Sequence, residues 1–91
     1  MDTIQPVPTG AVTVVLRGYL SREYRESQRT VTLPFADAAT PRRILAQLSI
    51  PVGAVGLLLM SRAHVDRQQV SMDTPLQAGD TLEVLPLLGG G

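Results

Sequence analysis

The sequence predicts a single α+β domain in which one main helix packs across a mixed sheet of four to five strands. Three observations predict this class: two alternating apolar runs flank a polar segment, an amphipathic helix follows them, and further strand-like runs come after the helix. This order is typical of one helical layer on one sheet, since strands and helices do not alternate strictly. A chain of 91 residues is long enough for one such core.

The first two strands are expected in AVTVVLRGY, which starts at Ala11, and in RTVTLPF, which starts at Arg29. Apolar residues alternate in both runs, and alternation places them on one face of a strand. These apolar positions are Val12, Val14, Leu16, Val31, Leu33 and Phe35. The polar segment between the runs, LSREYRESQ, is interpreted as an exposed hairpin connection.

A short helix is expected next, in ATPRRILAQLSIP. Thr40 is a good N-cap, and Pro41 fits the first helical position because its missing N–H has no partner there in any case. Ile44, Leu45 and Leu48 form the apolar stripe that would cover the hairpin. Pro51 is expected to stop the helix.

The remaining segments complete the sheet. GLLLMS reads as an apolar strand, RAHVDRQQVSM as a turn and a short edge strand, and MDTPLQAGD as a loop whose Leu76 points inward. TLEVLPL closes the sheet, with Leu82 and Val84 inward and Glu83 and Leu85 outward.

This strand order is that of the β-grasp (ubiquitin-like) fold, in which the first and last strands are parallel neighbours at the centre of the sheet. Pro86 is expected to mark the end of strand pairing, because proline cannot donate to a ladder. The expected organisation is a flexible leader at residues 1–10, a β-grasp domain at residues 11–86 and a flexible tail at residues 87–91.

Composition excludes several classes of chemistry. The chain has no cysteine, and therefore no thiolate nucleophile and no disulfide. It has no lysine for Schiff-base chemistry, and its zero net charge argues against a nucleic-acid partner. Residues 1–10 lack the features of a signal peptide, and no stretch approaches the roughly 18 apolar residues of a membrane span. We therefore expect a cytoplasmic protein without a membrane partner.

No active site is indicated inside the predicted fold. The single histidine, His64, has no second metal-ligating histidine or cysteine, and it is interpreted as a solvated turn residue. No glycine pattern of a phosphate-binding loop occurs. Four aspartates in turn-like contexts are interpreted as structural: Asp37, Asp66, Asp73 and Asp80. We expect no bound cofactor, no metal and no enzymatic activity of the chain alone.

The C-terminal segment LEVLPLLGGG is the remaining candidate for chemistry. At an average glycine usage of about 7%, three successive glycines at a set position arise by chance roughly once in 3,000 chains. A glycine carboxylate is unhindered, and the preceding glycines tolerate any backbone conformation, so such a tail can enter a narrow channel of another protein. Gly90 and Gly91 are therefore the candidate reactive residues.

The segment DTPLQAGDTLEVLPLLGGG, together with the strand order, resembles the MoaD/ThiS family of ubiquitin-like sulfur carriers. The resemblance rests most on Thr74-Pro75-Leu76, Gly79-Asp80, Pro86 and the terminal glycines, and it covers roughly residues 11–91. Family members usually end in two glycines, whereas this chain has three. The length and the arm between the first two strands favour the molybdopterin-synthase small-subunit type over the thiamin type.

The resemblance implies that an E1-like adenylyltransferase uses ATP to activate the C-terminal glycine. A sulfur donor then converts the adenylate to a thiocarboxylate. A synthase large subunit, or an equivalent enzyme, would take the sulfur for molybdopterin, with thiamin or cysteine as other destinations. Two other functions remain open from the sequence: a ubiquitin-like modifier conjugated through the same glycine, and a non-catalytic β-grasp interaction module.

Apolar residues near the tail are expected to bind the partner. The strand GLLLMS must turn either Leu57 and Leu59 or Leu58 and Met60 away from the helix, and outward apolar residues suggest a docking patch, although scattered surface leucines are common. The expected partner-binding residues are Leu58, Met60, Leu85, Pro86, Leu87, Leu88 and Gly89.

Overall fold

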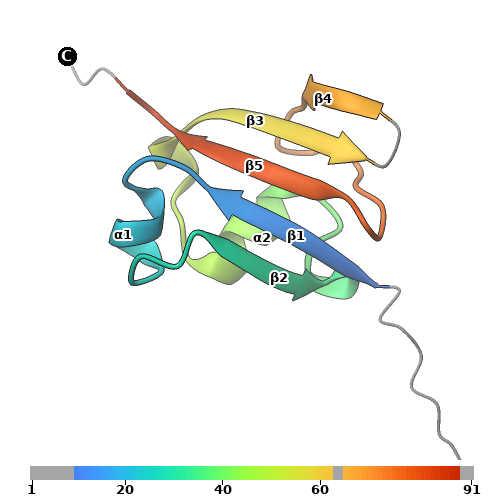
Figure 1. Cartoon of the computed structure of the whole chain (residues 1–91), viewed down its shortest axis with the longest axis horizontal. Coiled ribbons are helices and arrows are strands. Elements are labelled where there is room, and N and C mark those ends of the chain that lie inside the picture. Colours follow the sequence, from blue (N-terminus) through green and yellow to red (C-terminus); the bar gives the residue numbers. More distant parts are fainter. Residues whose placement is uncertain (1–9, 63–64, 89–91) are drawn as a thin grey trace, which may run out of the picture.

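The computed structural model describes residues 10–62 and 65–88. Its elements are β1 (Ala11–Leu16), α1 (Leu20–Tyr24), β2 (Thr30–Pro34), α2 (Pro41–Leu48), β3 (Val55–Arg62), β4 (Val65–Gln69) and β5 (Thr81–Pro86). Figure 1 shows α2 lying across one face of the sheet, while α1 and the C-terminal end of β5 lie at the same end of it. The predicted leader and glycine tail fall mostly outside the described residues and stay predictions.

The five strands form one mixed sheet in the order β2-β1-β5-β3-β4. β1 runs parallel to β5, with Val14 opposite Leu82, and the other three strand pairs are antiparallel. The predicted central pairing of the first and last strands and the predicted edge strand are therefore confirmed, and the fold is the β-grasp fold.

The core lies between the sheet and α2, and alternation along the strands supplies it. β1 buries every second residue, β5 directs Leu82 and Val84 into the core, and α2 buries its predicted apolar stripe of Ile44, Leu45 and Leu48. Leu76 plugs the core from the loop before β5, as predicted. Burial of each of these side chains stabilises the fold by roughly 1.5–3 kcal/mol.

The ends of α2 follow from local chemistry. Thr40 Oγ1 accepts a hydrogen bond from the Arg43 N–H at 3.3 Å, and Pro41 occupies the first turn, as predicted. At the other end, Ser49 adopts a left-handed conformation with φ of 59°, and Ile50 N–H donates to the Leu45 carbonyl at 2.9 Å. The helix therefore ends at a left-handed cap before the chain reaches Pro51, and the proline is not what ends it.

The connection between β1 and β2 differs from the prediction. Residues 20–24 form the short helix α1 instead of an exposed loop, and Leu20 is fully buried. The physical reason is a turn at Gly18, whose positive φ of 59° redirects the chain so that Leu20 packs into the core. The polar composition of the segment concealed this one apolar anchor.

A buried ion pair fixes the loop before β5. The Asp80 side chain is buried, and its two oxygens accept hydrogen bonds from Arg62 Nε at 2.8 Å and Nη2 at 2.9 Å. The Gln77 N–H also donates to Asp80 Oδ2 at 2.7 Å. The Arg62 guanidinium holds the pKa of Asp80 below its ordinary value of 3.8, in spite of the burial that opposes ionisation. The structural role predicted for Asp80 is thereby confirmed.

We expect the substitution Asp80→Asn to lower the free energy of unfolding by about 1–3 kcal/mol, because it weakens charge-assisted hydrogen bonds of a buried carboxylate. The pKa of Asp80 is depressed on folding, so its contribution is present above the unfolded pKa and disappears as the pH falls through the folded pKa. Urea denaturation at pH 7 and below pH 3.8 measures both effects.

The matched control is Asp73→Asn, which removes an exposed carboxylate that pairs with Arg42. It should leave the midpoint of unfolding almost unchanged. Equal destabilisation by the two substitutions at pH 7 would show that burial of Asp80 contributes nothing.

Candidate functional site

The end of β5 is held in place by neighbouring segments. Leu87 N–H donates to the Ala54 carbonyl at 2.8 Å, so one hydrogen bond continues past Pro86. The Tyr19 hydroxyl donates to the Leu87 carbonyl at 3.2 Å. Strand pairing as such ends at Pro86, in agreement with the prediction, but the chain stays attached to the fold for one residue more.

Two glycines permit the close approach of neighbouring segments to this strand end. A Cβ on Gly18 would lie 2.7 Å from Pro86 Cγ, and a Cβ on Gly56 would lie 2.8 Å from the Pro86 carbonyl oxygen. Real side chains do not tolerate such distances, so any larger residue would displace Pro86. The backbone at Gly18 and Gly56 thus determines where the C-terminal segment leaves the domain.

The last described residues point into solvent. Leu87 is 56% exposed and Leu88 is 76% exposed, and they are the most exposed large apolar side chains of the described chain. Pro86, in contrast, is buried, so its predicted role in partner binding is wrong, and it packs under the turn at Gly18 instead. The predicted reactive residues Gly90 and Gly91, together with Gly89, lie outside the described residues.

The outer face of the sheet, which is the face opposite α2, carries a second apolar group. Leu57, Leu59 and Leu85 are half-buried on this face, and Leu57 lies directly opposite Leu85 in the register of β3 and β5. Leu58 and Met60 are each 4% exposed and belong to the core.

The prediction that Leu58 and Met60 bind a partner is therefore wrong. The sequence GLLLMS is apolar on both faces, so its periodicity could not decide which face packs against the helix. The buried face of β3 is determined by its pairing with β5, which places Leu58 opposite Val84 and Met60 opposite Leu82.

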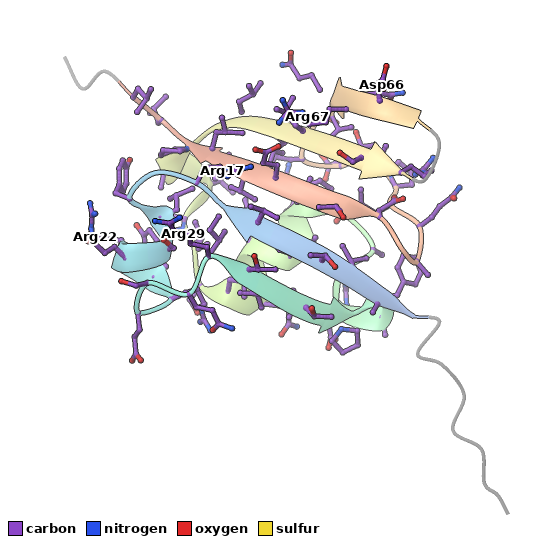
Figure 2. The ribbon with its side chains drawn as sticks, in the orientation of Figure 1. Arg17, Arg22, Arg29, Asp66 and Arg67 are labelled. Atoms are coloured by element: carbon purple, nitrogen blue, oxygen red, sulfur yellow. The ribbon has the colours of Figure 1, made fainter. Side chains whose placement is uncertain are left out.

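A charged cluster lies beside these leucines. Glu83 accepts hydrogen bonds from Arg17 Nε and from Arg67 Nη1, the latter at 2.7 Å. This carboxylate on β5 therefore joins one cation that follows β1 and another on β4, which lie on either side of β5. Figure 2 shows Arg17 and Arg67 on this face. Arg17 first, and Arg67 in addition, hold the pKa of Glu83 below its usual value of 4.5. The carboxylate is only 8% exposed, since the two guanidinium groups cover it.

Sequence reasoning had placed Glu83 outward but had not predicted its partners. Arg17 and Arg67 are 50 positions apart in number, and only the strand order β1-β5-β3-β4 brings them to one residue. The same holds for Tyr19, which reaches Leu87 across the sheet end. The available signal was a charged residue directly after β1, one on β4 and one at an outward-facing position of β5.

Within residues 10–62 and 65–88, no group of three or more histidine and acidic side chains is arranged to hold a metal ion. None of the helices formed by these residues has the length and apolar character needed to cross a membrane. The arrangement is an apolar group on the outer face beside a projecting strand end, with no constellation for acid–base or nucleophilic chemistry among the described side chains.

Comparison with known proteins decides the family. The sequence matches the ThiS family over residues 19–91, which includes α1, the outer-face leucines of β3 and β5, and the glycine terminus. The chain belongs to the ThiS family. The sulfur carriers of this family are small proteins that act with E1-like and synthase partners, and their activity depends on those enzymes.

A solved structure supports the fold of this ThiS-family chain. The C-terminal ubiquitin-like domain of mouse tubulin-specific chaperone e is similar with a TM-score of 0.50 and 18% sequence identity, and the likeness covers 89% of each chain. At this identity the comparison establishes the ubiquitin-like fold alone. A search of curated proteins finds no match. The molybdopterin-synthase type therefore stays a prediction within the family.

We expect Tyr19→Phe to speed the hydrogen exchange of the Leu87 amide roughly two- to tenfold, which corresponds to loss of one ordinary hydrogen bond. The reason is that Leu87 makes both bonds: its carbonyl accepts from the Tyr19 hydroxyl, and its N–H donates to the Ala54 carbonyl. Exchange measured by NMR at native conditions tests this expectation.

Tyr24→Phe is the matched control, because the Tyr24 hydroxyl makes no hydrogen bond with any residue that the structure describes. It removes the same atom from the same region. If both substitutions change the Leu87 exchange rate equally, the Tyr19 hydroxyl does not hold the strand end.

Proposed function

We propose that this chain is a sulfur carrier whose C-terminal glycine is adenylated by an E1-like enzyme and then converted to a thiocarboxylate. The observation that carries the proposal is the ThiS-family match, which runs through the glycine terminus at residue 91. The fixed strand end with exposed Leu87 and Leu88 supports it, since a carrier must present its terminus away from its own fold.

The proposed chemistry consists of a substitution at phosphorus that adenylates the terminal carboxylate, followed by an acyl substitution at its carbon. One carboxylate oxygen attacks the α-phosphorus of ATP, and pyrophosphate leaves. A sulfide-type nucleophile then attacks the acyl carbon, and AMP leaves with the bridging oxygen. The product is a thiocarboxylate, and all catalytic groups are supplied by the partner enzyme, which fits the lack of a catalytic constellation among the described residues.

The fold contributes position. Leu87 is tied to Ala54 and Tyr19, so the segment free to enter a partner begins at Leu88. The four residues 88–91 extend by at most about 14 Å, since an extended chain spans roughly 3.3–3.6 Å per residue. The partner's active site must then lie within that distance of the carrier's surface, and close docking of the domain is required for the reaction.

The outer face is the surface that we propose for this docking. Leu57, Leu59 and Leu85 form an apolar group next to the departing segment, and the Arg17–Glu83–Arg67 cluster adds fixed charge at its side. An E1-like adenylyltransferase and a sulfur-accepting synthase would use this face in turn. Molybdopterin is the first choice as the destination of the sulfur, with thiamin or cysteine as the others.

Incubation of the full chain with an E1-like enzyme, ATP and sulfide should exchange one oxygen for sulfur at Gly91, as measured by intact mass. A chain that lacks Gly90 and Gly91 should fold equally well and show no exchange, because the terminus no longer reaches the activating site. Higher-mass conjugates with other proteins, in place of a thiocarboxylate, would identify a ubiquitin-like modifier and contradict the carrier. Activity of the truncated chain would contradict it as well.

The substitutions Leu57→Arg and Leu85→Arg should each weaken binding to the E1-like partner by tenfold or more, about 1.4 kcal/mol, because they place a charge in an apolar contact. Titration calorimetry with the full chain measures the affinity. Ala46→Arg adds the same side chain to an exposed position of α2, on the other side of the domain, and should leave affinity unchanged. Equal effects of all three would place the docking surface elsewhere.

A further inference from the structure

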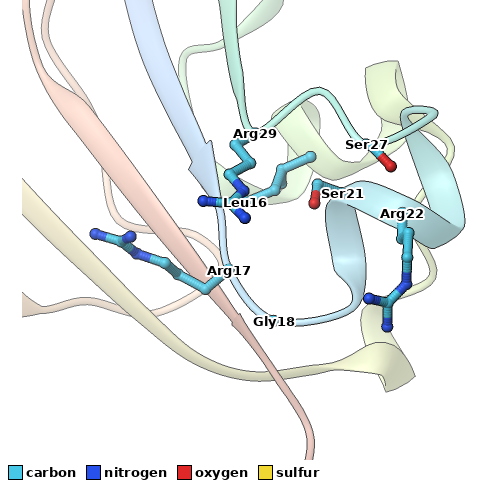
Figure 3. A pocket seen from close by; sticks show the side chains of 7 residues that line it. All are labelled: Leu16, Arg17, Gly18, Ser21, Arg22, Ser27 and Arg29. Atoms are coloured by element: carbon cyan, nitrogen blue, oxygen red, sulfur yellow. The ribbon is translucent and has the colours of Figure 1, made fainter.

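A polar hollow lies between the C-terminal end of β1, the helix α1 and the start of β2. Its volume is about 360 Å³, and its walls include Ser21, Arg22, Ser27 and Arg29 (Figure 3). A space of this size is in the range of small-molecule sites. Arg17 and Gly18 separate it from the outer face and from the departing strand end, and its remaining walls belong to neither of them.

Two arginines that line the hollow have no hydrogen-bond partner among the residues that the structure describes. Six other arginines of the described chain donate to carboxylates or carbonyls: Arg17, Arg25, Arg42, Arg43, Arg62 and Arg67. Arg22 and Arg29 donate to no residue in the described ranges 10–62 and 65–88, and both line the hollow. In Figure 3 Arg17 turns away from these two, over β5 toward Glu83.

The hydroxyl of a largely buried serine accompanies the two guanidinium groups. Ser21 is only 6% exposed, and its hydroxyl makes no hydrogen bond to another described residue. In the view of Figure 3 the Ser21 hydroxyl lies between the guanidinium groups of Arg22 and Arg29. The hydroxyl borders the hollow, so it can donate to a molecule that is bound there.

The backbone around the hollow is held in an uncommon shape. Glu26 and Ser27 both adopt positive φ, 52° and 73°, although neither is glycine. Such conformations cost of order 1–3 kcal/mol each and persist where the surroundings enforce them. Here the Ser27 N–H donates to the Ser21 carbonyl at 2.9 Å, and this bond places the two serines on the same wall.

We propose that this hollow binds a phosphate-bearing small molecule, with Arg22 and Arg29 as the cationic contacts and the hydroxyls of Ser21 and Ser27 as additional donors. Two guanidinium groups and two hydroxyls match the several oxygens of a phosphate better than the two oxygens of a carboxylate. The volume exceeds that of a phosphate group alone and leaves room for an organic part. This inference does not depend on the sulfur-carrier function.

The hollow and the C-terminal segment are bordered by the same loop. The loop Arg17–Tyr19 forms the rim of the hollow through Gly18 and also holds the strand end, since Gly18 packs on Pro86 and Tyr19 donates to Leu87. A ligand that orders this loop contacts the same backbone that fixes where the C-terminal segment leaves the domain.

The test is a titration of the full chain, labelled with ¹⁵N, with inorganic phosphate and separately with AMP at constant ionic strength. Binding should shift the amide signals of Gly18, Ser21 and Ser27 in a saturable manner. The double substitution Arg22→Gln and Arg29→Gln should weaken that binding by at least tenfold, as expected for loss of charge-assisted hydrogen bonds. Tighter binding of AMP than of phosphate would show that the ligand is a nucleotide. Equal binding would show that the hollow recognises the phosphate group alone.

The control is Arg43→Gln, which removes one guanidinium from an exposed position of α2. It should leave phosphate affinity unchanged, and the amide spectra show directly that each variant is folded. Shifts that do not saturate, or equal weakening by Arg43→Gln, would overturn the proposal in favour of general attraction between anions and arginines. Acetate binding as strong as phosphate binding would overturn the assignment of phosphate.

Discussion

The parallel pairing of β1 with β5 is the constraint on which the rest of the structure depends. It joins the start of the domain to its end at the centre of the sheet, and its register places Val14 opposite Leu82 over the α2 stripe. Because both strands run in the same direction, their C-terminal ends meet at one edge. The turn after β1 therefore lies against the segment that leaves β5, and a single loop can border the hollow and hold the strand end.

The two faces of this sheet have separate tasks. The inner faces of β1, β3 and β5 bury apolar side chains that hold the domain together, whereas the outer face combines half-buried leucines with a carboxylate covered by two arginines. Such a face suits the proposed function, in which the chain binds more than one enzyme, since apolar contact supplies affinity and fixed charge supplies orientation. The terminus then requires no catalytic group of its own.

Alternation and capping rules were sufficient to predict most of the fold. The faces of β1 and β5, the N-cap at Thr40 and the inward Leu76 all follow from local patterns, and the family resemblance agrees with the ThiS match. Local patterns failed on β3, where both faces are equally apolar and alternation could not say whether Leu58 or Leu59 is buried. They also failed at Leu20, which is a single buried residue within a polar segment. Contacts between distant strands, such as those of Glu83, depend on register and were beyond sequence reasoning.

The covered carboxylate of Glu83 has a consequence for self-association. One negative charge lies beneath two positive ones, so the centre of the outer face carries an excess of one positive charge. If two copies met through their outer faces, Arg17 and Arg67 of one would face the same residues of the other, and like charges in close contact are costly. If this face binds partner enzymes as proposed, the like charges oppose its pairing with a second copy of the chain.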